Sequence, residues 1–337
     1  MRRPPETMSA PRFFTQSTPD PAVCRHLMAA QPLNPFATPA YLEAERILGA
    51  EPWLLGYHSD EMLLGCLTFI RSGRMSRTLT IPSAPNAPQE FWDHVQTFCA
   101  DQRVTNVEVN TFASPAGSIP PLGEELSRFE RFECIVSLQA SPGEMLKRMR
   151  MNHRRNVRKA INADASLRTG EDCSLDDHVR LMSASMQRRR QRGEDIDCEP
   201  SAAALQPYLK TGFCRLFQVA AAGEVVSSIM VACSAKARYL YTSGTSPAGM
   251  DIGASHFLVY GIMQAGQTES ASVFNLGGTA DLSSGLGQYK SGFGAETVRL
   301  EAAQFYTGNA LHKAVSGSAR LVKNMLNRAR TFAGRNA

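Results

Sequence analysis

The sequence lacks the features that would place the protein in a membrane or in the secretory route. No window of its 337 residues approaches 18 consecutive apolar residues, which is about the length that a membrane-spanning helix requires. Arg2 and Arg3 stand near the N-terminus, but Pro4, Pro5 and Pro11 follow where a signal peptide would need an unbroken apolar stretch. We therefore expect a cytoplasmic protein.

Two further classes of site have no support in the sequence. The eight cysteines form no Cys-x-x-Cys pair and no spacing typical of a metal site, so we expect reduced cysteines and no bound metal. A Gly-x-Ser-x-Gly motif is also absent, which disfavours a serine hydrolase. Hydrophobic residues make up 43% of the chain and charged residues 20%, a composition that excludes a disordered chain and, at this length, indicates about two domains.

Short β-prone runs alternate with helical stretches, which predicts a mixed α/β protein. Two predicted hairpins, with polar turns at 58–61 and 221–224, superpose when Tyr57 is placed on Val219, an offset of 162 residues. The predicted strand 107–109 falls on 274–276 at an offset of 167. Two near-equal offsets in the same order favour a duplicated α/β unit over the alternative, a chance similarity between β-rich segments.

Composition and charge suggest four segments. Residues 1–38 are rich in proline, serine and threonine and are expected to form an irregular N-terminal arm. We assign 39–140 to a first unit and 141–302 to a second unit. Residues 303–337 contain no acidic residue and have an amphipathic pattern, which predicts a basic helix that docks on the protein, contacts an anionic membrane or binds RNA.

A strongly basic helix is predicted between the two units, over 145–163. Its apolar positions recur every four residues along one stripe, and His153 lies on that stripe, so we interpret His153 as a packed side chain. Residues 147–159 contain seven Lys or Arg and no acid, and like charges at this spacing destabilise a helix that has no anionic partner. We expect an anion site here, with a merely solvated face as the alternative. Its candidate substrate-binding residues are Arg154, Arg155, Asn156, Arg158 and Lys159.

The densest motif follows the predicted strand at 274–276. Asn275 precedes the pair Gly277 and Gly278, and a short predicted helix then presents Tyr289 and Lys290. Glycine accepts dihedral angles that side chains forbid, so the pair could let the backbone separate and approach a ligand closely.

Together with 151–160 and 241–245, this motif resembles the FemAB-like branch of the GNAT acyltransferase superfamily, over about residues 140 to 300. The resemblance implies an α/β fold of two tandem GNAT-like units with mixed central sheets. It implies transfer of an acyl or aminoacyl group from a thioester or a charged tRNA to an amine-bearing acceptor. The donor partner would be coenzyme A, an acyl carrier protein or tRNA, with acyl-CoA or another activated acyl donor as co-substrate and no permanently bound cofactor.

The resemblance also suggests catalytic residues, all in the second unit. Tyr289, four residues before Phe293, is similar to the GNAT tyrosine that protonates the departing thiolate of coenzyme A. Lys290 would stabilise the oxyanion or hold a donor phosphate, and His256 is the next candidate for the acid. The remaining expected substrate-binding residues are Asn275, Gly277, Gly278, Tyr241, Gly244 and Thr245.

The sequence departs from the family at the loop that normally binds pyrophosphate. The candidate stretch, 246–255, contains Asp251, which would repel phosphate. The donor therefore stays open. The alternative function is a non-catalytic module that binds RNA or another anionic polymer on the same fold.

Overall fold

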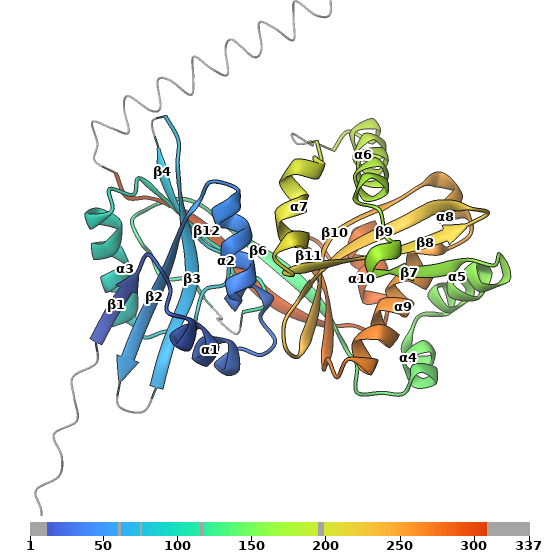
Figure 1. Cartoon of the computed structure of the whole chain (residues 1–337), viewed down its shortest axis with the longest axis horizontal. Coiled ribbons are helices and arrows are strands. Elements are labelled where there is room, and N and C mark those ends of the chain that lie inside the picture. The colour runs from blue at the N-terminus through green and yellow to red at the C-terminus, as the bar shows by residue number, and fades with distance from the viewer. Residues whose placement is uncertain (1–11, 60–61, 75, 115–117, 195–198, 309–337) are drawn as a thin grey trace, which may run out of the picture.

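The computed structural model describes residues 12–59, 62–74, 76–114, 118–194 and 199–308 (Figure 1). Their strands form one continuous sheet. In sheet order the strands are β1 (Arg12–Gln16), β2 (Glu51–Ser59), β3 (Met62–Ser72), β4 (Arg77–Ile81), β5 (Asn106–Val109), β12 (Glu296–Tyr306), β6 (Glu124–Ser137), β11 (Val273–Thr279), β10 (Ala237–Thr245), β9 (Glu224–Cys233), β8 (Cys214–Ala221) and β7 (Ser166–Thr169).

The sheet contains the same five-strand arrangement twice. Strands β1 to β4 are antiparallel neighbours and β4 pairs with β5 in parallel. Strands β7 to β10 are likewise antiparallel neighbours, and β10 pairs with β11 in parallel. The two predicted hairpins, β2–β3 and β8–β9, therefore occupy equivalent places, which confirms the expected duplication.

The two units exchange their last strands. β6 follows β5 in the chain but pairs with β11 of the second unit, whereas β12 follows β11 in the chain but pairs with β5 of the first unit. β6 and β12 also pair with each other in antiparallel register over eleven residue pairs, from Glu296↔Ile135 to Tyr306↔Glu124. Each unit therefore completes its sheet with a strand that comes from the other.

The structure departs from the expected segments at three places, the last two because of this exchange. Within the expected irregular arm 1–38, residues 12–16 form edge strand β1, and α1 (Pro21–Ala30) packs against β3. The expected boundary at 140 separates β6 from the sheet of the second unit, to which it belongs. The expected C-terminal helix begins within β12, and its part beyond residue 308 lies outside the described residues.

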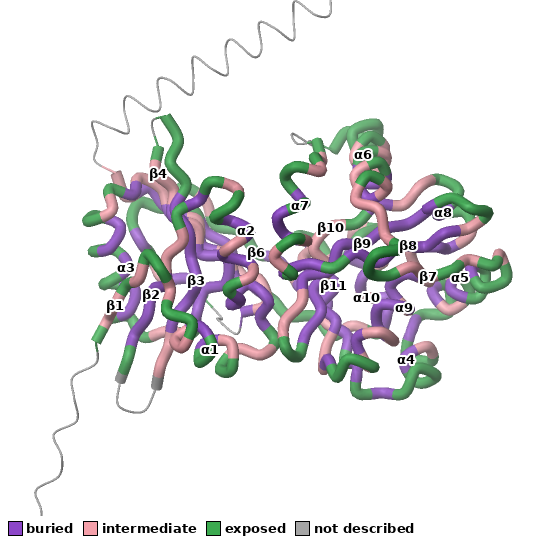
Figure 2. Tube along the Cα trace, viewed as in Figure 1, coloured by how far each residue is buried: buried purple, intermediate pink, exposed green. Residues whose placement is uncertain are grey.

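Helices cover both faces of each unit. The remaining helices are η1 (Pro35–Ala37), α2 (Pro39–Ile47), α3 (Gln89–Asp101), α4 (Pro142–Arg148), α5 (Met151–Asn162), η2 (Gly170–Asp172), α6 (Leu175–Gln191), α7 (Ala202–Lys210), α8 (Pro247–Asp251), α9 (Ala254–Thr268) and α10 (Gly285–Ser291). In the first unit, α3 packs on one face and α1 and α2 on the other; in the second unit, α9 packs on one face and α6 on the other. Buried residues follow the strands through both units (Figure 2).

A third hydrophobic core joins the two units. Tyr41 of α2 packs against Phe213, just before β8, with ring centroids 4.8 Å apart. The Tyr208 hydroxyl of α7 donates a hydrogen bond to Glu45 of α2 (2.8 Å), so the buried carboxylate has a partner. Burial of aromatic side chains is a large source of stabilisation, and here it fixes the units against each other as well as within themselves.

The predicted basic helix over 145–163 is two helices. Ser141 caps α4 through a capping box with Glu144, and the chain then becomes extended at Met149 and Arg150. The break allows the backbone N–H of Arg150 to donate to the carbonyl of Gly292, next to α10 (2.8 Å). The start of α5 is thereby attached to the segment that carries the densest sequence motif.

Gly244 lets α6 rest directly on β10, and its replacement should destabilise the protein. A Cβ at Gly244 would overlap the backbone of Leu181 and Met182 in α6. We expect Gly244→Ala to lower the free energy of unfolding by about 1–3 kcal/mol, measured by urea denaturation. Gly143→Ala in α4 is the control, because no atom lies within 4 Å of a Cβ there. Equal stability of the two variants would contradict the direct packing of α6 on β10.

Candidate functional site

Strands β10 and β11 separate part of the way along the second unit. They pair in parallel from Ala237↔Val273 to Tyr239↔Asn275. Beyond this point β10 continues along β9, while β11 continues along β6. In a sheet, such a separation exposes backbone groups that have lost their neighbour and can meet a ligand instead.

The equivalent place in the first unit is closed. Beyond the last parallel pair of β4 and β5, the N–H of Ala84 donates to the carbonyl of Asn110 (2.8 Å) and the N–H of Phe112 to that of Pro82 (3.1 Å). An isolated bridge between Ser83 and Thr111 continues the contact. Of the two described units, the second is the one that opens.

The expected glycine pair forms the bulge at which β11 turns away. Gly277 has a φ of 74°, a conformation that favours glycine, and its N–H donates to the side-chain oxygen of Asn275 (2.8 Å). A Cβ at Gly278 would lie 2.8 Å from the guanidinium of Arg131. Asn275 is buried at 3% exposure. The pair therefore makes room for Arg131 of β6, and Asn275 holds the bulge from inside.

Lys290 of α10 lies beside this bulge. Its Nζ donates to the carbonyl of Gly278 (2.6 Å), and a Cβ at Gly277 would lie 3.6 Å from it. The side chain is 7% exposed, and burial lowers its pKa to about 8. Near neutral pH this amine can therefore hold a proton or accept one, at the opening between β10 and β11.

Tyr289 lies on another face of α10, away from Lys290. Its hydroxyl donates to the carbonyl of Ser255 in α9 (3.3 Å), and burial raises its pKa to about 12. Its ring packs near Phe293 and His256, each at 5.1 Å between centroids. The expected Tyr289 and Lys290 pair is therefore divided between two environments.

The buried His153 and the half-buried His256 complete the aromatic environment of Tyr289. His153 of α5 and His256 of α9 lie 4.6 Å apart between ring centroids, and His153 Nε2 lies 2.9 Å from the carbonyl of Tyr289. Burial lowers the pKa of both, that of His256 to about 4, with His153 as a second cause. The packed position expected for His153 is confirmed, and His256 is uncharged at neutral pH.

Arg131 and Glu133 of β6 also belong to the site, although no sequence motif includes them. They form a buried ion pair at 2.6 Å, and the Tyr239 hydroxyl donates to the same Glu133 oxygen (2.8 Å). The sequence of β6 does contain a signal for them. Arg131 and Glu133 are two residues apart and so lie on the same face of the strand, directly before its apolar part begins at Cys134. Buried charges are costly unless paired, so this spacing indicates a built arrangement.

The expected basic residues lie on α5. Arg155, Arg158 and Lys159 are exposed, and Arg154 donates to the carbonyl of Lys147 (3.2 Å). None of these four has an ion pair with a carboxylate within the described part of the chain. The α5 cations therefore form a separate basic face, attached to the site through the helix that carries them.

Asn156 faces α9 instead of the basic face. Its amide nitrogen lies 3.4 Å from His256 Nε2. A Cβ at Gly253, which begins α9, would lie 2.5 Å from the carbonyl oxygen of Asn156. α5 therefore packs directly against the first turn of α9, where the family loop would bind a pyrophosphate.

Three other residues expected to bind substrate make packing contacts. Tyr241 packs against Tyr208 at 5.2 Å between ring centroids, in the core that joins the units. Gly244 lies under α6. The Thr245 hydroxyl is 2.9 Å from that of Ser227, and its carbonyl accepts a hydrogen bond from Arg188. These positions follow β10 after it leaves β11, but their contacts are with β9, α6 and α7.

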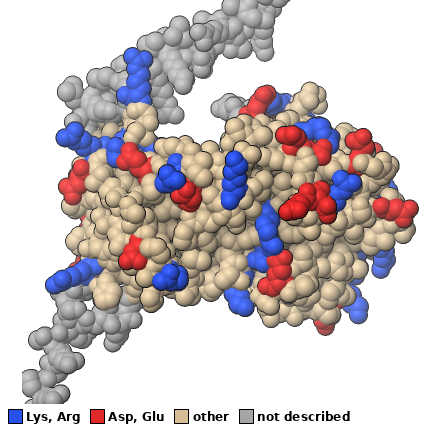
Figure 3. All heavy atoms as spheres, in the orientation of Figure 1, with Lys and Arg blue, Asp and Glu red and all other residues tan. Residues whose placement is uncertain are grey.

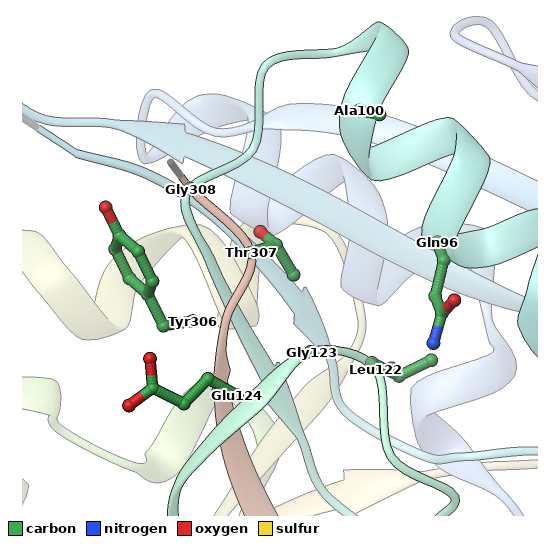
Figure 4. A pocket seen from close by; sticks show the side chains of 8 residues that line it. All are labelled: Gln96, Ala100, Leu122, Gly123, Glu124, Tyr306, Thr307 and Gly308. Atoms are coloured by element: carbon green, nitrogen blue, oxygen red, sulfur yellow. The ribbon is translucent and has the colours of Figure 1, made fainter. Parts of the chain in front are cut away.

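Distinct cavities also lie on the first unit. One of about 550 Å³ lies where β12 ends, with Tyr306 and Glu124 on one side and Gln96 of α3 on the other (Figure 4). A second, of about 820 Å³, lies beside it at the start of β4. Neither is lined by Tyr289, Lys290 or the glycine pair.

Metal ligation and membrane insertion find no support in the described residues. Within that part of the chain, no three His, Cys, Asp or Glu side chains are grouped in a way that could hold a metal ion. None of its helices combines the length and apolar character needed to span a bilayer.

On the face shown in Figure 3, basic and acidic side chains are interspersed.

Comparison with known proteins relates part of the chain to a known domain. Residues 147–291 match the family model of the acetyltransferase (GNAT) domain. The separating strands β10 and β11 and helix α10 lie within this matched segment. No curated protein sequence matches the chain.

The structure as a whole is similar to three solved structures. FemX matches with a TM-score of 0.67 and 11% identity, over 87% of this chain and 98% of that chain. A tandem GNAT protein from the clavulanic acid biosynthesis pathway matches at 0.53 and 12%, over 89% and 100%. A conserved protein of unknown function from Bacteroides thetaiotaomicron matches at 0.51 and 10%, over 83% and 96%. The fold of two tandem GNAT-like units and the resemblance to the FemAB-like branch are confirmed.

Two histidines with lowered pKa values should make the protein sensitive to acid. The pKa is lowered to about 4 for both His256 and His178, a buried histidine of α6 that lies between Ser228 and Thr242. A histidine with a lowered pKa binds its proton mainly in the unfolded state, so stability is lost as pH falls from about 6.5 towards 4.

We expect the free energy of unfolding to fall by about 1.4 kcal/mol per histidine for each pH unit in this range, measured by urea denaturation at pH 7.5, 6 and 5. His256→Gln should reduce the slope. Substitution of the exposed His26 by glutamine should leave it unchanged, and a His256 imidazole that titrates by NMR between pH 6 and 7 would contradict the assignment.

Proposed function

We propose that the protein is an N-acyltransferase or aminoacyltransferase whose reacting carbonyl lies in the opening between β10 and β11. The observation that carries the proposal is Lys290, a buried amine with a lowered pKa at the place where the second unit opens and the first does not. A lysine that served only to bind the Gly278 carbonyl would still bring the cost of burying a charge.

The reaction needs orientation, a group that stabilises the oxyanion and removal of one proton. The acceptor nitrogen forms a bond to the carbonyl carbon, the bond from that carbon to sulfur or oxygen breaks, and one proton moves from the amine to the departing group. Protonated Lys290 stabilises the oxyanion, and its neutral form accepts the proton of the amine. Tyr289 stays protonated at neutral pH and is the candidate donor to the leaving group, once its hydroxyl releases the Ser255 carbonyl.

The basic face of α5 favours a polyanionic donor. Arg155, Arg158 and Lys159 are exposed, and α5 itself packs on the turn that would otherwise bind the pyrophosphate of coenzyme A. Asp251 lies two residues before that turn and opposes an anion there. Charged tRNA is therefore our first candidate donor and an acyl carrier protein the second, both in the cytoplasm. The sequence beyond residue 308 adds a proposed contact with an anionic membrane.

The transfer activity can be tested without knowledge of the acceptor. Hydroxylamine serves as a general amine acceptor, and the hydroxamate formed from aminoacyl-tRNA, acyl-loaded acyl carrier protein or acetyl-CoA is measured after subtraction of the rate without enzyme. Lys290→Met should lower turnover about a hundred- to a thousand-fold, because it removes a group that stabilises the transition state. Lys210→Met, an exposed lysine of α7, should leave turnover unchanged. Absence of transfer from all three donors by the folded wild type would favour the alternative, a non-catalytic binding module.

The role of α5 is tested by the salt dependence of donor binding. We expect Arg155→Glu with Arg158→Glu to weaken binding and to flatten the decrease of affinity with salt, since fewer phosphates or carboxylates are paired. Arg25→Glu with Arg46→Glu on α1 and α2 is the charge-matched control. Equal affinity and equal salt slope in both double variants would show that α5 is only a solvated helix.

A further inference from the structure

The point where β10 and β11 separate is built around one carboxylate, that of Glu133. Its side chain is 1% exposed. Besides Arg131 and Tyr239, it accepts hydrogen bonds from Asn275 Nδ2 (2.7 Å) and from the backbone N–H of Ala113 (3.2 Å). A buried carboxylate with this many donors is held in one position.

A continuous set of contacts leads from Glu133 to Lys290. Asn275 donates to Glu133 with its amide nitrogen and accepts from the N–H of Gly277 with its amide oxygen (2.8 Å). The next residue, Gly278, accepts from Lys290 Nζ (2.6 Å). Every step is a hydrogen bond or a peptide link, so a displacement at Glu133 would move the acceptor that orients the amine.

We propose that Glu133 is the positioning residue of the site, which fixes Asn275 and the Gly277–Gly278 bulge and so directs the Nζ of Lys290 into the opening. The inference rests on the proposed function and names a residue that acts through Lys290. Glu133 lies on β6, the strand that the second unit receives through the exchange. Strand exchange thus supplies the second unit with the residue that organises its site.

The first unit also contacts Arg131 and Glu133. The guanidinium of Arg131 lies over the ring of Phe112, 4.0 Å from its centroid, and Ala113 donates to Glu133. Both residues follow β5 in the first unit. The first unit therefore holds both Arg131 and Glu133 in place, although its own parallel strands do not separate.

Glu133 also contributes to the charge state of Lys290. Burial is the main cause of the lowered pKa of Lys290. Among the charged groups, Cys134 and then Glu133 raise this pKa and Arg131 lowers it, and all three lie on β6. Loss of the Glu133 charge would leave Arg131 without its partner beside Lys290. The pKa of Lys290 would then fall further below its ordinary value.

The test measures Lys290 directly, without substrate. The rate at which acetic anhydride labels Lys290 is followed against pH by peptide mass spectrometry, with Lys210 as internal reference. In Glu133→Gln we expect the midpoint to move about one pH unit lower. Glu130→Gln, an exposed carboxylate on the same strand, should leave the midpoint in place. An unchanged midpoint in folded Glu133→Gln would overturn the proposal.

The positioning role has its own variants. Asn275→Ala breaks the link but keeps the charge, so turnover with the active donor should fall about a hundred-fold at unchanged donor KM, while the midpoint of Lys290 stays. Glu133→Asp should keep the wild-type midpoint, because the charge remains. If Glu133→Gln does not fold, the turnover of Asn275→Ala carries the test. Wild-type turnover in Asn275→Ala overturns the positioning role. If the wild type transfers no acyl group, this result contradicts only the proposed function. The effect of Glu133 on Lys290 is still decided by the titration, which needs no substrate.

Discussion

The pairing of β6 with β12 is the interaction on which the rest of the structure depends. Each strand ends one unit in the chain and completes the sheet of the other, and the eleven pairs between them make the two sheets one. An open sheet edge with unpaired N–H and C=O groups is unfavourable, so neither unit can close its edge at this side without the other. The exchange therefore fixes the relation of the units through backbone hydrogen bonds as well as through the shared aromatic core.

The two units share a topology, but only in the second do the two parallel strands separate. In the first unit, backbone hydrogen bonds between 82–84 and 110–112 hold the parallel strands together beyond their last regular pair. In the second, Asn275 satisfies the N–H of Gly277, and the bulge follows β6 instead. A difference of a few backbone hydrogen bonds thus separates a closed sheet from one that can admit a ligand.

Helix α10 places Lys290 and Tyr289 in two different environments. One face places Lys290 among the charged groups of β6, and another places Tyr289 among the rings of His153, His256 and Phe293. The backbone contact of Arg150 with Gly292 joins the second environment to α5 and its basic face. A polyanion bound on α5 would therefore lie on a helix anchored directly beside the residues that we assign to the chemistry.

The sequence by itself determined the two hairpins, the duplication and the family motif. Apolar periodicity predicts the hairpins, and glycine with Tyr289 and Lys290 marks the motif, because these signals act between residues close in the chain. Only the tertiary structure decided which strands pair at the centre, that Tyr241 and Gly244 serve packing, and that Glu133 meets Asn275. These depend on contacts between residues more than 30 positions apart, for which a strand carries the same alternating pattern whichever partner it takes.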